Sequence, residues 1–160
     1  MIGRTVFYFF RWADESAVGA AIRGSTWVFA FIEVFHLLGL TLLLGTVVLV
    51  NLRLCGYGLR RQSMAEVASD ALPWMLVGMA VTMASGSLLF VSEAMKCYGS
   101  PPFFVKMGFL FTALVFTFTL HRRLTKRNSP PPPVWGKVAA GFSLFLWFGV
   151  GLAGRAIAFY

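Results

Sequence analysis

Four long apolar stretches dominate the sequence and limit what the chain can fold into. They are residues 27–50, 71–92, 103–120 and 138–159. Each holds about 18 to 24 residues, enough at 1.5 Å per residue to cross a hydrocarbon core about 30 Å thick. Lipid offers no partner to backbone N–H and C=O groups, so the spans must be helical, and the alternating pattern of a membrane barrel is missing. The sequence therefore predicts an all-α fold, a bundle of four transmembrane helices.

Composition supports a membrane protein and argues against a soluble catalytic domain. Hydrophobic residues make up 58% of the chain and charged residues only 12%, whereas soluble domains are about half apolar and a quarter charged. Any chemistry must therefore use side chains inside the bilayer or at its edge. The net charge of +8 comes mostly from the short connections, a pattern typical of contact with lipid headgroups and not of nucleic-acid binding. We expect the lipid bilayer as a partner and no nucleic acid.

The connections between the spans differ sharply in charge, which predicts the orientation of the chain. The first and third connections hold the basic residues Arg53, Arg60, Arg61, Arg122, Arg123, Lys126, Arg127 and Lys137. The second connection holds only Lys96. Basic connections remain in the cytoplasm, so we expect a multi-pass protein of the bacterial inner membrane with both termini on the periplasmic side. Cys55 would then lie inside and Cys97 outside, unable to pair with each other.

Residues 1–25 precede the first span and form a segment of their own. An aromatic run around residues 6–10 is followed at once by charged residues, without a small-residue cleavage site, so a signal peptide is not indicated. We expect an amphipathic segment lying in the outer interface, followed by a four-helix transmembrane domain over residues 26–160. Three basic residues of this segment run against the charge asymmetry: Arg4, Arg11 and Arg23.

Ionisable residues within the spans are few, and each is unfavourable in hydrocarbon unless it is paired or hydrated. Glu33 and His36 are three residues apart and share a helix face. Lys106 lies in the third span and Arg155 in the fourth, while Glu93 follows the second. Counting at about 1.5 Å per residue places all five in the outer half of the membrane. Two carboxylates and two cations can form a neutral cluster there.

Two interpretations of this cluster remain open. In the first, it is a ligand pocket: His36 supplies an imidazole nitrogen to a metal, Glu33 orients the site or pairs with a cation, and Lys106 or Arg155 meets an anionic group such as a propionate. In the second, the long side chains are interfacial anchors that reach the headgroups. Glu33 and His36 then serve in hydrogen bonds between helices.

His121 ends the third span beside two arginines, at the expected cytoplasmic boundary. The same count separates it from His36 by about 14 Å along the membrane normal, so one haem held between the two histidines is disfavoured. Ligation by one histidine, a ligand from a partner subunit, and two separate sites stay open. A boundary histidine exchanges its partners for water, so we expect His121→Ala to be mild and His36→Ala to be severe.

Several short motifs carry a resemblance to one group of proteins. They are Phe35-His36-Leu37-Leu38-Gly39-Leu40, Leu52-Arg53-Leu54, Val105-Lys106-Met107, His121-Arg122-Arg123 and Ala153-Gly154-Arg155-Ala156-Ile157-Ala158-Phe159. From about residue 27 onward, the chain resembles an uncharacterised branch of the bacterial four-helix membrane proteins related to copper-resistance protein D and HemJ-type protoporphyrinogen oxidases.

The resemblance implies a four-helix bundle in which His36 and Lys106 are functional positions. It implies haem b through the HemJ-like relatives and copper through the other branch. The sequence departs from the group in two ways. It has no Met-rich or Cys-containing ligand set near His36, and it has Asn51 where the branch often carries Asp.

We therefore expect a small integral membrane protein whose outer-leaflet pocket binds haem b, or a similar planar redox ligand, through His36. It would act in electron transfer or as a subunit of a larger membrane complex, and we expect a homo-oligomer or such a complex. The alternatives are a non-enzymatic structural or accessory subunit, and copper or proton translocation. Whether the protein is an enzyme stays open.

Overall fold

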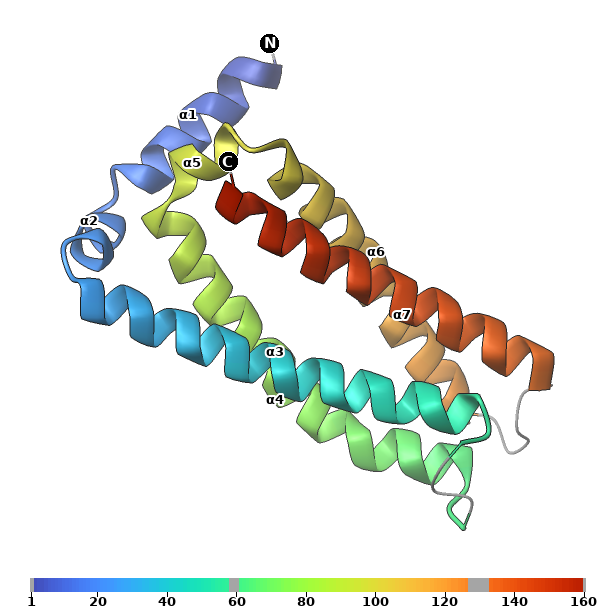
Figure 1. Ribbon diagram of the computed structural model, residues 1–160. Coiled ribbons are helices and arrows are strands. Elements are labelled where there is room, and N and C mark those ends of the chain that lie inside the picture. Colours follow the sequence, from blue (N-terminus) through green and yellow to red (C-terminus); the bar gives the residue numbers. More distant parts are fainter. Residues whose placement is uncertain (1, 58–60, 127–132, 160) are drawn as a thin grey trace.

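The computed structural model describes residues 2–57, 61–126 and 133–159, and every regular element in this part of the chain is a helix (Figure 1). The elements are α1 (Ile2–Asp14), α2 (Ala17–Arg23), α3 (Thr26–Leu54), α4 (Met64–Ser92), α5 (Ala94–Tyr98), α6 (Pro101–Lys126), α7 (Pro133–Ala156) and the 3-10 turn η1 (Ile157–Phe159). The helices α3, α4, α6 and α7 are long and apolar enough to cross a membrane. The predicted all-α, four-helix membrane fold is confirmed.

Each of the long helices extends at one end or both beyond the span expected from hydropathy, as α3 and α4 illustrate. The helix α3 continues to Leu54, and α4 begins at Met64, seven residues before the expected start. A capping box begins α4: the Glu66 N–H donates to Ser63 Oγ over 3.2 Å, and the Ser63 N–H donates to Glu66 Oε2 over 2.7 Å. These bonds satisfy backbone donors that the first helical turn leaves unpaired.

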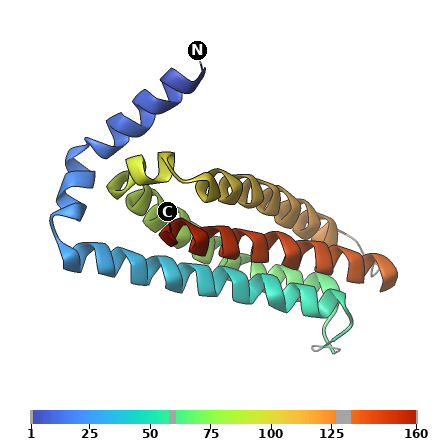
Figure 2. The same cartoon turned by 45° about the horizontal axis from the view of Figure 1, so that its top comes forward.

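The bundle consists of two helix pairs, α3 with α4 and α6 with α7, which lie side by side in both views (Figures 1 and 2). Contact between α3 and α4 is the most extensive because glycines bring their backbones together. A Cβ atom on Gly39 would lie 2.8 Å from Thr82 Oγ1, and one on Gly78 would lie 2.7 Å from the backbone nitrogen of Leu43. No side chain fits at either position, so these glycines set the register of the pair.

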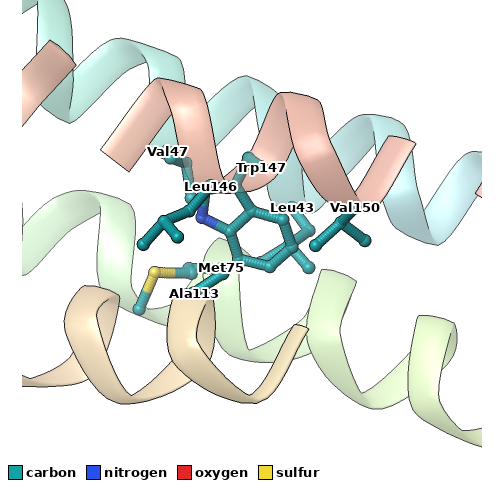
Figure 3. Close-up of a cluster of buried hydrophobic side chains, with 7 residues drawn as sticks. All are labelled: Leu43, Val47, Met75, Ala113, Leu146, Trp147 and Val150. Carbon is teal, nitrogen blue, oxygen red and sulfur yellow. The ribbon is translucent and has the colours of Figure 1, made fainter. Parts of the chain in front are cut away.

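Buried side chains of all four long helices form the centre of the bundle (Figure 3). This cluster contains Leu43, Val47, Met75, Ala113, Leu146, Trp147 and Val150. The indole of Trp147 is buried within it and donates a hydrogen bond from Nε1 to Thr117 Oγ1 over 3.1 Å. Outward-facing positions of the same helices are apolar and exposed, for example Phe31 and Phe145. Such a surface fits contact with a lipid bilayer.

The N-terminal helices α1 and α2 pack against the end of the bundle where α4, α5 and the start of α6 meet (Figure 2). The α1 helix buries Phe10 and Ala13 and exposes Tyr8, Phe9 and Trp12. The Phe10 ring contacts the ring of Phe90 edge-on, with centroids 5.2 Å apart. The segment is thus helical and amphipathic, while its position in the membrane interface stays a prediction.

Candidate functional site

His36 lies on the face of α3 that meets α4, and its ring is half-buried. A Cβ atom on Gly86 of α4 would lie 3.1 Å from His36 Cε1, so the glycine gives the ring its space. The ring is held by a neighbour of that glycine, because His36 Nδ1 lies 3.1 Å from Ser85 Oγ. Two adjacent small residues of α4 therefore position the histidine.

The hydrogen bonds of Ser85 determine which nitrogen of His36 remains available. Ser85 Oγ donates to the backbone carbonyl of Val81 over 2.6 Å. A hydroxyl has one hydrogen, and when Ser85 donates it to the Val81 carbonyl, Ser85 Oγ accepts from a protonated Nδ1 of His36. In the neutral ring the lone pair then lies on Nε2, the nitrogen that can bind a metal.

Lys106 lies at the same end of the bundle, on α6, with its amine against α7. A Cβ atom on Gly154 would lie 3.7 Å from Lys106 Nζ. The amine is close enough to interact electrostatically with the His36 ring and with Cys97. Within the described residues it forms no salt bridge. Lys106 is therefore a partly buried cation that can receive an anionic group of a ligand.

The other outer residues predicted from the sequence do not join into one neutral cluster. Glu33 is exposed, one turn before His36, and makes no salt bridge among the described residues. Glu93 Oε2 lies 3.5 Å from Lys96 Nζ instead of meeting Lys106 or Arg155. The exposed guanidinium of Arg155 lies over the Phe159 ring, 5.6 Å from its centroid. The structure thus places His36 and Lys106 at the same end of the bundle, and among the described residues the expected neutral cluster of two carboxylates and two cations is not formed.

His121 requires a correction. We expected a boundary residue in contact with water, but the side chain is only 5% exposed. It lines a small cavity with Thr117 of its own helix, Asn51 of α3 and Ser143 of α7. The reason is that α3 and α6 extend several residues beyond their apolar stretches. Neighbouring helices therefore still surround His121 at a depth that hydropathy assigns to the surface.

Asn51 and Ser143 also line this cavity, and neither was predicted as a site residue because neither is ionisable. Both are 2% exposed, and Asn51 Nδ2 donates to Ser143 Oγ over 3.1 Å. A signal for Asn51 exists in the sequence, because it follows the core residue Val47 by four positions and shares its helix face. Ser143 has no comparable signal in a helix rich in small residues.

The two histidines belong to separate sites. Asn51 shares a cavity with His121 and follows His36 on α3 by about 22 Å at 1.5 Å per residue. One planar ligand cannot contact both rings within this chain. Among the described residues, no three His, Cys, Asp or Glu side chains gather closely enough to hold a metal ion. A metal bound by His36 would therefore have at most one further ligand of this kind from the described residues.

The chain matches, over residues 9–160, the model of a family described as a family of unknown function (DUF6644), and it belongs to that family. No curated protein and no solved structure matches the chain. The matched region contains all four long helices and both histidine sites.

Proposed function

We propose that the protein binds haem b, or a similar planar redox ligand, through His36 at the outer end of the bundle. It would act in electron transfer or as a subunit of a larger membrane complex. The supporting observation is the 3.1 Å contact between His36 Nδ1 and Ser85 Oγ, whose hydrogen has the Val81 carbonyl as an acceptor. In the tautomer with Nδ1 protonated, Nε2 carries the lone pair that can bind a metal. Histidines that ligate metals are usually oriented in this way by a hydrogen bond to their other nitrogen.

The residues around His36 fit a planar ligand that carries carboxylates. One imidazole serves a metal centre, and the Lys106 amine, which has no carboxylate partner among the described residues, can pair with a propionate. Arg155 is exposed at the same end and offers a second cation. A bound haem would supply one-electron redox chemistry, while His36 and Lys106 bind and orient it. The resemblance of the motifs around these two residues to HemJ-type proteins supports the same positions.

A structural role for His36 is the competing proposal, supported by the same contact. The bond between His36 and Ser85 joins α3 to α4 beside the glycine contacts of that pair. In a structural or accessory subunit this bond would stabilise the bundle and bind nothing. Copper handling has less support, because no group of three metal-binding side chains is found among the described residues.

The absorption spectrum of protein purified from haem-replete cells tests the proposal. We expect a Soret band that is lost in His36→Ala and returns when imidazole is added to this variant. Ser85→Ala should keep the band but weaken haem binding about 10- to 100-fold. Thr41→Ala is the matched control, since this exposed α3 residue bonds only to the Leu37 carbonyl of its own helix, and its spectrum should be unchanged.

Two outcomes would overturn the haem proposal. One is a wild-type protein without a Soret band despite haem-replete expression, and the other is a band that His36→Ala leaves intact. A wild-type protein without the band, combined with a loss of thermal stability in His36→Ala, would favour the structural subunit.

We further propose that this multi-pass protein lies in the bacterial inner membrane with both termini on the periplasmic side. The charge asymmetry of the connections supports this orientation. It places the His36 site toward the periplasm and the His121 cavity toward the cytoplasm.

A further inference from the structure

A small cavity with both polar and apolar residues in its lining lies between α3, α4, α6 and α7, in the half of the bundle that contains His121. The space open to the centre of a water molecule there is about 20 Å³. Its polar lining consists of Asn51, Thr117, His121 and Ser143, and its apolar lining includes Val47 and Met75. The buried position of Asn51, Ser143 and His121 makes this an internal site of the bundle.

The polar side chains of this cavity retain hydrogen-bonding capacity. Ser143 Oγ accepts from Asn51 Nδ2, and Thr117 Oγ1 accepts from Trp147 Nε1, each over 3.1 Å. Within the described part of the chain, neither hydroxyl hydrogen and no lone pair of the Asn51 carbonyl oxygen is used in another hydrogen bond. Two donors and one acceptor, one from each of three helices, therefore surround the same small space.

These dimensions match one particular ligand. A buried water needs at least about 10 to 15 Å³ of such space and two to four polar partners. We infer that the cavity binds a single water molecule, which accepts from Ser143 and Thr117, donates to Asn51 and lies beside the ring of His121. Leaving polar groups unsatisfied is unfavourable where lipid surrounds the bundle, and this water satisfies one group on each of the three helices.

The water would give the site a role that a dry contact lacks. It ties α3, α6 and α7 together at the level of His121, and it lies beside a buried imidazole with which it can exchange a proton. This inference does not depend on haem binding, because the cavity and His36 lie in opposite halves of the bundle.

Solid-state NMR in liposomes can detect the water directly, since the chain has only two histidines. In His36→Gln, ring-labelled histidine reports His121 alone, and this background also removes the proposed haem ligand. We expect magnetisation to pass from water to the His121 ring several-fold faster than to the methyl group of Ala113, a residue of the core with 0% exposure. Asn51→Leu, added to this background, should slow the transfer to His121 several-fold.

Ser87→Ala on α4 serves as the matched control, because this exposed hydroxyl bonds only to the Met83 carbonyl of its own helix. It should leave the transfer to His121 unchanged. Transfer to His121 as slow as that to Ala113 would show a dry cavity and overturn the inference. Fast transfer that persists in Asn51→Leu would overturn it too, since the water would then come from outside the bundle. The remaining signals of each variant must coincide with those of the parent, which shows that the bundle is folded.

Discussion

Arg23 at the end of α2 donates a hydrogen bond from Nη1 to the backbone carbonyl of Ser92, the last residue of α4, over 2.7 Å. Its Nη2 donates to the Asp14 carbonyl over 2.6 Å, and Asp14 Oδ1 accepts from the backbone N–H of Met95. One guanidinium therefore joins the N-terminal helices to the end of α4. This local role explains an arginine that runs against the charge asymmetry of the connections.

Arg23→Ala should destabilise the end of the bundle where α2 meets α4. The change removes hydrogen bonds to two backbone carbonyls and the 3.4 Å ion pair with Asp14. Because the side chain is partly exposed, we expect a loss of about 1 to 2 kcal/mol in the free energy of unfolding. Thermal unfolding in one detergent measures it. The control is Arg11→Ala, which removes only an exposed pair with Glu15 and should change stability by less than about 0.5 kcal/mol. Equal losses of stability in Arg23→Ala and Arg11→Ala would show that the contacts of Arg23 do not stabilise the fold more than an exposed ion pair does.

Gly78→Ala should loosen the α3–α4 pair. The new methyl group would lie 2.7 Å from the backbone nitrogen of Leu43, which cannot move aside as a flexible side chain can. Overpacking of this kind typically destabilises by about 1 to 3 kcal/mol. At Gly45 of α3 no atom lies within 4 Å of the added Cβ, so Gly45→Ala should leave the thermal unfolding midpoint unchanged or slightly raised. A stable Gly78→Ala variant would mean that the two helices are less closely packed.

The reactivity of Cys97 should depend strongly on pH. This thiol is 8% exposed, and burial, followed by the charge of Glu93, raises its pKa above the ordinary value of 9.0. In a Cys55→Ser chain, alkylation of the folded protein should therefore be slow at pH 7 and accelerate above pH 9. The folded state holds this proton more tightly than the unfolded state, so stability should fall as the pH rises above about 9. Alkylation at pH 7 as fast as in denatured protein would contradict the burial.

A buried Cys97 is a poor probe of orientation, so exposed positions are needed. In a chain without its natural cysteines, Glu15→Cys should react with a membrane-impermeant maleimide on intact cells. Gln62→Cys, between α3 and α4, should react only after the inner membrane is permeabilised. Both positions are exposed, which makes the two variants comparable. The opposite pattern would invert the orientation and place the His36 site in the cytoplasm.

His121→Ala should be more destabilising than His36→Ala, the reverse of the expectation from depth counting. Removing the buried imidazole leaves a larger void beside the Asn51–Ser143 pair, at a loss of about 1 to 3 kcal/mol. His36 is half-buried, and without it Ser85 still donates to the Val81 carbonyl, so a loss of about 0.5 to 1.5 kcal/mol is expected. Thermal unfolding of both variants without added haem decides the order. A smaller loss of stability in His121→Ala than in His36→Ala would show that His121 lies at the membrane boundary, as depth counting predicted.

The four spans could be predicted because bilayer thickness fixes how long an apolar helix must be. Their ends could not be taken from hydropathy alone. The first turns of α4 carry Glu66 and Asp70 on the exposed face, while Val67 and Ala68 are buried. The mean hydropathy over both faces of these turns is therefore low, and a low value predicts that the span has ended. The Ser63 to Glu66 spacing is a capping-box signature and would have located this start.

The candidate sites were predictable only in part, because side chains meet across helices at a register that one sequence does not contain. Counting residues placed His36 in the outer half, but its contact with Ser85 depends on how closely Gly39 and Gly78 let α3 approach α4. For His121 the same counting failed, because it measured depth from the ends of apolar runs and α6 continues past them.

The position of Trp147 has a consequence for spectroscopy. The chain has five tryptophans. Four of them, Trp12, Trp27, Trp74 and Trp135, are between 60% and 77% exposed, whereas Trp147 is 4% exposed. Brominated lipids or aqueous quenchers can reach the first four in the native state, so the fluorescence that resists both comes from one indole in the centre of the bundle. That residual emission follows the loosening of the interior separately from changes at the surface, in the unsubstituted protein and without an added label.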